Sequence, residues 1–189
     1  MTKNKKAVLV LDHQNLLINS YVKQADEYLL RLKLFLDGVR KQKVPIIFVT
    51  VGFRSGFPEI CDKNKIFRSV RDGGRFLDTD DESQIPESII KRDNDLVLKK
   101  HRVSAFEGTE LQVILRAQGV SKIILFGIIT SGVVLSTVRQ AADLDYELTV
   151  LEDFCHDPSP DVQEVLLRKI LPMQSSVVTS DECLKLLVD

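Results

Sequence analysis

The segment AVLVLDHQN, residues 7–15, joins an uninterrupted apolar run to a group of polar side chains. A continuous apolar run, rather than an alternating one, is typical of a strand that is buried on both faces, as in a parallel sheet. A carboxylate at the end of such a strand is costly unless it is paired or hydrogen-bonded. Asp12 is therefore a candidate catalytic group, and the competing interpretation is a structural cap or a pair with a lysine.

Further apolar runs of the same kind occupy residues 45–51, 96–98, 123–126, 148–151 and 176–179. Apolar residues recur at intervals of three and four, as in amphipathic helices, over residues 29–39, 111–115, 134–142 and 162–170. Strands that alternate with helices predict an α/β fold, a three-layer αβα sandwich with a mostly parallel six-stranded sheet of the Rossmann-like kind. The length of 189 residues fits a single domain spanning residues 1–189.

Ligands of open parallel sheets bind beyond the carboxyl ends of the strands, so polar residues that follow different strands should meet there. Asp12 follows the first strand, Lys99 and Lys100 follow the third, and residues 127–133 lead from the fourth strand into a helix. Strand alternation sends Lys99 and Lys100 to opposite faces, so that one lysine turns towards Asp12. The alternative is a solvated basic edge. The irregular segment 52–90 is long enough to be a functional loop.

The composition excludes several classes of protein. Twenty-six basic and 27 acidic residues leave a net charge of −1, which gives no overall attraction to nucleic acid or to a membrane surface. Cys61, Cys155 and Cys183 contain no C-x-x-C pair, and the three histidines lack ligand spacing, so we expect neither a disulfide framework nor a metal. We expect no cofactor. We also expect a cytoplasmic protein, because the N-terminus lacks the apolar core of a signal peptide.

Three segments in order resemble the motifs of the isochorismatase-like hydrolases, the cysteine hydrolase superfamily that includes nicotinamidases, N-carbamoylsarcosine amidases and isochorismatases. They are VLDHQN at 10–15, KHRVSAFEGTEL at 100–111 and GIITSGVVLST at 127–137. The resemblance spans nearly the whole chain. It implies the isochorismatase-like fold, a catalytic aspartate at Asp12, a catalytic lysine at Lys100, and Val133 at the position where amidases of the family carry the nucleophilic cysteine.

The valine at that position argues against an acyl-enzyme route. In this respect the chain resembles a group of relatives that share the pattern TSGVVLST and also lack the cysteine. Isochorismatases offer a route without a thiol, in which a protonated aspartate delivers a proton to a vinyl carbon and water captures the cation. Asp12 and Lys100 could perform it on a small polar or anionic metabolite. A nearby ammonium lowers the pKa of a carboxyl group and burial raises it, and the sequence does not decide between them.

Two alternatives stay open, a catalytically inactive small-molecule-binding member of the family and an amidase that recruits Cys61 or Cys155. The hydrolysed bond could be C–O or C–N. The resemblance also implies a homodimer or a higher homo-oligomer, for which the C-terminal helix from residue 181 to 188 is one candidate surface.

The candidate substrate-binding residues lie near the same strand ends. Arg54 could hold an anion with its planar guanidinium, and Phe53 and Phe57 could wall the pocket, although a surface arginine beside two packing aromatic residues is the competing interpretation. The remaining candidates are Gln14, Ile129 and Thr130. Backbone N–H groups near Ile129 and Val133 could stabilise an anionic oxygen. The resemblance also predicts a cis peptide bond near residues 128–129.

Overall fold

The computed structural model describes residues 5–91 and 93–188. Its centre is one sheet with the strand order β3-β2-β1-β4-β5-β6, and every neighbouring pair runs parallel. The strands are β1 Lys5–Leu11, β2 Ile46–Val51, β3 Leu96–Lys100, β4 Val120–Gly127, β5 Glu147–Leu151 and β6 Ser176–Val178. The sequence prediction of a parallel six-stranded α/β fold is confirmed.

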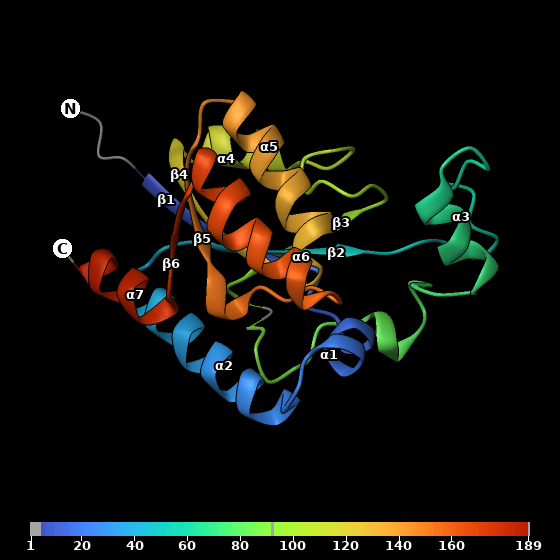
Figure 1. Cartoon of the computed structure of the whole chain (residues 1–189), viewed down its shortest axis with the longest axis horizontal. Helices are drawn as coiled ribbons and strands as arrows, with labels where there is room; N and C mark the ends of the chain where they lie inside the picture. Colours follow the sequence, from blue (N-terminus) through green and yellow to red (C-terminus); the bar gives the residue numbers. More distant parts are fainter. Residues whose placement is uncertain (1–4, 92, 189) are drawn as a thin grey trace.

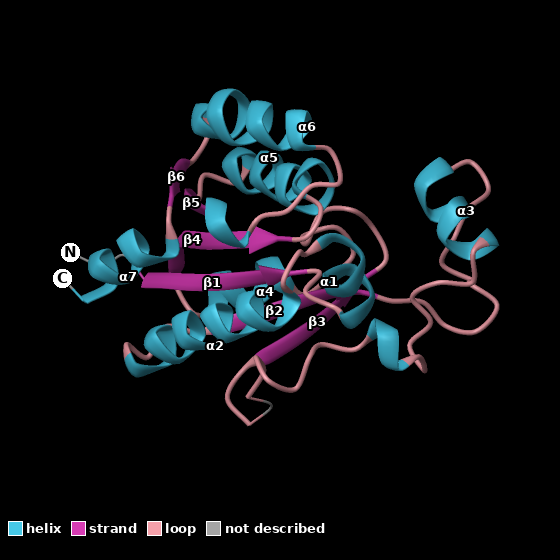
Figure 2. Ribbon diagram, turned by 60° about the horizontal axis from the view of Figure 1, so that its bottom comes forward, coloured by secondary structure: helices cyan, strands magenta, loops and turns pink. Residues whose placement is uncertain are grey.

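The helices lie in two layers and at one end of the sheet. They are α1 Asn15–Tyr21, α2 Ala25–Lys41, α3 Lys65–Asp72, α4 Leu111–Ala117, α5 Leu135–Asp143, α6 Pro160–Val165 and α7 Ser180–Val188. Figure 2 shows α5 and α6 together on one side of the sheet and α2 on the other, while α1 lies towards the carboxyl ends of the strands. No helix in residues 5–91 and 93–188 is both long and apolar enough to span a membrane.

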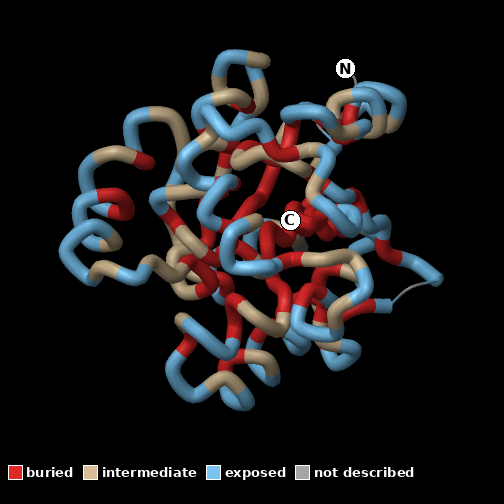
Figure 3. Tube along the Cα trace, turned by 90° about the vertical axis from the view of Figure 1, so that its right-hand side faces the viewer, coloured by how far each residue is buried: buried red, intermediate tan, exposed pale blue. Residues whose placement is uncertain are grey.

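Burial explains why the apolar runs are continuous. The side chains of residues 7–11 in β1 have no exposed surface, and all six residues of β2 are buried. In a sheet covered on both faces, the side chains of both faces are buried, so apolar and polar residues do not alternate along the strand. Figure 3 shows this buried trace at the centre with exposed segments around it. The edge strand β3 differs, because Leu96 and Val97 are exposed.

The segment 52–90 contains more regular structure than its sequence indicates. It includes the helix α3 and a short 3-10 helix, Asp81–Ser83. The Asn64 side chain caps α3 by accepting a hydrogen bond from the backbone N–H of Phe67 at 3.3 Å. Figure 1 shows α3 held apart from the rest of the molecule, beyond the ends of β2 and β3. The prediction of an irregular segment was wrong here, because α3 has only eight residues and buries only Phe67 and Val70, a pattern too short to stand out in the sequence.

Candidate active site

Asp12 and Lys100 meet at the carboxyl ends of β1 and β3. Lys100 Nζ lies 3.0 Å from Asp12 Oδ2, and it also donates a hydrogen bond to the backbone carbonyl of Arg102 at 3.1 Å. The Lys100 residue is 2% exposed and the Asp12 residue 6%. The two groups are 88 positions apart in the chain, and β2 separates their strands in the sheet. The parallel topology therefore brings together the carboxyl group and the ammonium group that the sequence pattern singled out.

The second carboxylate oxygen of Asp12 has no partner. Oδ1 is buried and forms no hydrogen bond with any residue of the described ranges. Burial raises the pKa of the Asp12 carboxyl group, and the nearby Lys100 ammonium offsets only part of that rise. The backbone of Asp12 is also left-handed, with φ of 53°. Asp12 is thus a buried acid that holds its proton more tightly than an ordinary aspartate, with one oxygen free.

A cavity of about 440 Å³ opens beside this pair. Its wall is mostly apolar, and it is built from the strand ends, α1, the segment around α3 and the turn after β4. The lining residues are Asp12, Leu17, Tyr21, Val51, Ile66, Phe67, Ser69, Val70, Arg75, Phe76, Lys100, Val103, Ile128, Ile129, Ser131, Gly132 and Val133. Mostly apolar clefts with a few convergent polar groups are the usual form of small-molecule sites.

The turn after β4 supplies the wall opposite α3. Residues Thr130–Val134 form a π-helical turn, a wide turn that is frequent at functional sites. Ile129 just before it has φ of 84°, which is strained for a β-branched residue. The described residues contain no cis peptide bond, so the predicted cis bond at 128–129 was wrong. The chain reverses there through the positive φ of Ile129, with Thr130 N donating to the His156 carbonyl at 2.9 Å.

Glycine at position 127 allows β1 and β4 to close beneath this turn. A Cβ at Gly127 would lie 2.8 Å from the Leu11 carbonyl oxygen and 2.8 Å from Leu11 Cβ, closer than real Cβ atoms approach. Leu11 directly precedes Asp12, so the absence of a side chain at position 127 lets β4 pack closely against the strand end that carries Asp12. Val133 is 3% exposed and lines the cavity.

The residues predicted to bind substrate are placed differently from one another. Ile129 lines the cavity, whereas Gln14, Phe53, Arg54, Phe57 and Thr130 do not. Gln14 Nε2 donates to the carbonyls of Val51 and Ser83 at 2.8 and 2.6 Å, and its Oε1 accepts from Val51 N at 3.0 Å. Both polar atoms of this amide are therefore used to tie the end of β2 to the segment at Ser83.

The other predicted binders pack elsewhere. The Phe53 and Phe57 rings lie 6.0 Å apart, and Phe53 is fully buried against Phe67. The Arg54 side chain is 71% exposed and pairs with Glu59 at 2.8 Å. Thr130 is fully buried, and its hydroxyl has no partner among the described residues. The sequence interpretation of a surface arginine beside two packing aromatic residues matches this arrangement.

Arg75 lines the cavity and was not singled out from the sequence. It follows α3 in the segment DGGRF, residues 72–76, where it is exposed, and none of the described residues forms an ion pair or hydrogen bond with its side chain. Together with Lys100 it gives the cavity two cations against the single carboxylate of Asp12. The only sequence signal was an arginine in a glycine-rich turn, which does not reveal where the turn packs.

The three thiols lie away from the cavity wall. Cys61 is exposed on the loop before α3, and Cys155 and Cys183 are buried elsewhere. Burial raises the pKa of Cys155 to about 12, so its reactive thiolate form is strongly disfavoured near neutral pH. His13 lies on another face of the strand end, where its Nε2 is 2.6 Å from the Tyr28 hydroxyl. Within the described ranges, no three His, Cys, Asp or Glu side chains gather as metal ligands.

Comparisons with known proteins give a consistent result. A family model described as the isochorismatase domain matches residues 6–182. An uncharacterized isochorismatase family protein of Bacillus subtilis, YwoC, is 30% identical over 181 residues, which cover 96% of this chain and 93% of the relative.

Solved structures agree with the sequence relatives. An isochorismatase family protein from Burkholderia thailandensis superposes with a TM-score of 0.86 at 26% identity, covering 100% of this chain and 98% of the other. The N-carbamoylsarcosine amidase of Thermoplasma acidophilum gives a TM-score of 0.75 at 26% identity, with 94% and 97% of the two chains covered.

Proposed function

Since this chain belongs to the isochorismatase family, we propose that it is a hydrolase of a small polar or anionic metabolite that works without a cysteine nucleophile. Asp12 acts as the acid and base, and Lys100 is its electrostatic partner. The observation that carries the proposal is the pairing itself, a buried carboxyl group with one oxygen on an ammonium and the other oxygen unpartnered beside a cavity.

The environment of Asp12 suits a proton donor. Because burial raises its pKa, more of the carboxyl group stays protonated towards neutral pH, as in other enzymes that use a carboxylic acid as general acid. Lys100 occupies Oδ2, which leaves the proton to Oδ1. After the proton has left, the ammonium at 3.0 Å stabilises the new carboxylate without any rearrangement.

The cavity wall favours a route without a covalent intermediate, because Val133 has no nucleophilic atom and the three cysteines lie elsewhere. In this route the Asp12 proton moves to the vinyl carbon of a vinyl ether, and water adds to the resulting cation. The C–O bond of the adduct then breaks to give a carbonyl compound and an alcohol, and a proton returns to Asp12. We therefore propose C–O rather than C–N cleavage.

Arg75 is the proposed anion-binding residue. A guanidinium without an acidic partner at the edge of an apolar cavity suits a carboxylate, which it can hold through two parallel hydrogen bonds. Paired probes of equal shape test this assignment: nicotinate against nicotinamide, and benzoate against benzamide. We expect each acid to bind more tightly than its amide. The Arg75→Gln substitution should reduce the ratio of the amide Kd to the acid Kd about tenfold.

Calorimetric titration measures these affinities. Arg116→Gln is the matched control, because Arg116 is exposed on α4 away from the cavity and should keep the wild-type preference. Equal binding of acids and amides by the wild-type chain would contradict the role of Arg75 and leave that of Asp12 untouched.

A metabolite screen by thermal shift, followed by turnover of the hits, tests the catalytic assignment. Isochorismate and nicotinamide belong in the panel. We expect Asp12→Asn to lower kcat by about 10²–10⁴ while the circular dichroism spectrum stays unchanged, because Asn keeps the shape and an acceptor for Lys100 but cannot deliver the proton. Turnover of the wild-type chain should fall as pH rises through the raised pKa of Asp12, since only the protonated acid is competent.

Asp143→Asn, at an exposed position on α5, controls for nonspecific loss of a carboxylate. Undiminished turnover by Asp12→Asn would reject the proposal. The second candidate function is a small-molecule-binding protein without activity, which Val133 at the nucleophile position favours. It predicts hits that raise Tm while none is turned over. We further propose a cytoplasmic homo-oligomer without nucleic-acid partners, and light scattering of the purified chain tests its self-association.

A further inference from the structure

The Gln14 side chain continues the hydrogen-bond ladder between β1 and β2 beyond the point where β1 ends. The last backbone bond there joins the N–H of Asp12 to the carbonyl of Val49 at 2.9 Å. Asp12 then leaves the strand through its left-handed backbone, with φ of 53°. The next residue of β2 whose N–H and carbonyl face β1 is Val51. It meets a side-chain amide in place of main chain, because Gln14 Oε1 accepts from Val51 N at 3.0 Å and Gln14 Nε2 donates to Val51 O at 2.8 Å.

The Val51 N–H has two acceptors within its surroundings, the Gln14 amide oxygen and the Asp12 carboxyl group. Burial raises the pKa of Asp12, and the Lys100 ammonium and, after it, the Val51 N–H lower that pKa, so this N–H lies close to the carboxyl group. Its hydrogen bond nevertheless goes to Gln14, and Asp12 Oδ1 is buried without a partner among the described residues. An N–H that donates to a carboxyl group favours the ionised form. The two acceptors therefore compete for a donor that would cost Asp12 its proton.

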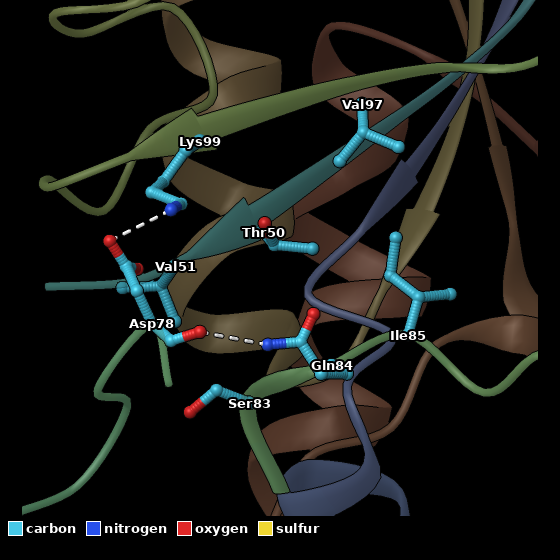
Figure 4. Close-up of a pocket in the computed structure, with 8 residues that line it drawn as sticks. All are labelled: Thr50, Val51, Asp78, Ser83, Gln84, Ile85, Val97 and Lys99. Atoms are coloured by element: carbon cyan, nitrogen blue, oxygen red, sulfur yellow. Dashed lines mark hydrogen bonds and ion pairs between the residues drawn. The ribbon is translucent and has the colours of Figure 1, made fainter. Parts of the chain in front are cut away.

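We propose that Gln14 is a positioning residue for the proton transfer: by taking the Val51 N–H, its amide leaves Asp12 Oδ1 free to carry the proton. The inference rests on the proposed function of Asp12 as an acid. Gln14 has no exposed surface, and its Nε2 also donates to the Ser83 carbonyl at 2.6 Å. Figure 4 shows Ser83 on the segment that runs past the end of β2, where Val51 lies. A flipped amide would place its oxygen against two carbonyls, so the Gln14 acceptor stays on Val51.

The charged and titratable groups around Asp12 are independent of Gln14. Lys100 Nζ lies 3.0 Å from Asp12 Oδ2, and Tyr21 of α1 and Arg75 after α3 line the same cavity. The bonds of the Gln14 side chain go to backbone groups alone. A neutral substitution at position 14 therefore leaves these charges in place and changes which acceptor receives the Val51 N–H.

Carbon NMR titration of the Asp12 carboxyl group tests the inference without any substrate, and Asp12→Asn identifies the signal. Gln14→Met keeps a similar shape but has neither amide atom, so the Val51 N–H can turn to Asp12. We expect the acid dissociation constant of Asp12 to rise about tenfold, because the ionised form gains a hydrogen bond. Gln14→Glu keeps an acceptor for the Val51 N–H and adds no donor to Asp12. It should leave this constant at or below the wild-type value.

The opposite directions separate this role from a structural one. Both variants lose the amide donor to the Ser83 carbonyl, so a residue that only tied these segments together would change Asp12 in the same direction in both. Asn15→Ala is the matched control. The Asn15 side chain bonds the same segment, donating to the Asp81 carbonyl at 2.9 Å, and Asp12 should titrate in this variant as in the wild-type chain.

An unchanged or smaller acid dissociation constant in Gln14→Met would overturn the proposal, and so would an equal rise in Gln14→Met and Gln14→Glu. The wild-type chain gives a measurement that needs no variant to fold. The proton signal of the Val51 N–H should move little as Asp12 ionises, because this donor stays on Gln14, and a large downfield move would overturn the proposal.

Turnover of any substrate found in the screen adds a separate readout. The activity of Gln14→Met should fall at lower pH than that of the wild-type chain, since Asp12 loses its proton earlier. A shifted Asp12 titration with an unshifted turnover profile would support the control of Asp12 by Gln14 and contradict the proposed function alone.

Discussion

Lys99 and Lys100 are adjacent on β3, and each pairs with an aspartate on a different face of the sheet. The two pairs have similar geometry, with N–O distances of 2.8 Å for Lys99–Asp78 and 3.0 Å for Lys100–Asp12. They differ in burial. The side chains of the first pair are 47% and 28% exposed, and those of the second are 2% and 8% exposed.

This difference decides what each pair can do. An exposed pair is screened by water and salt and contributes little to stability. A buried pair is held by strong attraction but carries a large desolvation cost, so neither partner is easily replaced and the pKa of the acid can move. Burial raises the pKa of the Asp12 carboxyl group, which is the direction that a proton donor needs. Burial, and not the N–O distance, therefore distinguishes the Lys100–Asp12 pair and supports the chemistry that we propose for it.

The largest expected effect comes from breaking the buried pair. Lys100→Met leaves the Asp12 carboxylate buried without a counter-charge, and we expect a loss of about 3–5 kcal/mol in the free energy of unfolding near neutral pH. Urea denaturation followed by circular dichroism measures this loss. Turnover should fall together with stability, because the conjugate base of Asp12 would have no stabilising ammonium.

The stability loss caused by Lys100→Met should also depend on pH, in a direction that follows from the raised pKa of Asp12. Without the ammonium, the pKa of Asp12 in the folded state rises further, and the penalty exists only while that carboxyl group is ionised. The stability difference between Lys100→Met and the wild-type chain should therefore be large at high pH and shrink as pH falls through the raised pKa. A difference that is constant between about pH 5 and pH 8 would show that Lys100 stabilises by packing alone.

The sequence indicates the buried pair but not the cavity around it. Continuous apolar runs locate the strands, and the parallel order then places Asp12 and Lys100 at one edge. Arg75 and α3 were missed because the helix has only eight residues and buries only two of them, Phe67 and Val70, which is too short a pattern to stand out in the sequence.

The same limit applies to Gln14. A glutamine after a strand can bind a substrate or brace a neighbouring strand, and only the position of Val51 and Ser83 decides which. The direction of the Asp12 pKa shift was likewise open in the sequence. It depends on how completely the helices and loops exclude water from the carboxyl group, and that is a property of the packed chain.

A smaller loss of stability is expected from adding a methyl group beside the exposed Lys99–Asp78 pair. A Cβ at Gly52 would overlap Asp78 Oδ1 and lie 3.2 Å from Lys99 Cδ. Gly52→Ala should therefore displace the Asp78 side chain and cost about 1–3 kcal/mol in the free energy of unfolding, as other overpacking substitutions do. Gly132→Ala is the control, because its Cβ would meet nothing closer than Ile129 Cγ2 at 3.5 Å. Equal stability of the two variants would mean that the segment around Asp78 yields easily.

The smallest effect is expected from Lys99→Gln. Removing a half-exposed ammonium should change the free energy of unfolding by at most about 1 kcal/mol, and the change should fade as salt rises from about 0.1 M to 1 M, where the Debye length drops to about 3 Å. Lys100→Met provides the contrast, because its loss arises in a site without solvent ions and should persist at high salt. If both losses faded equally with salt, water would reach Asp12 as freely as Asp78. The burial on which the proposed role of Asp12 depends would then be absent in solution.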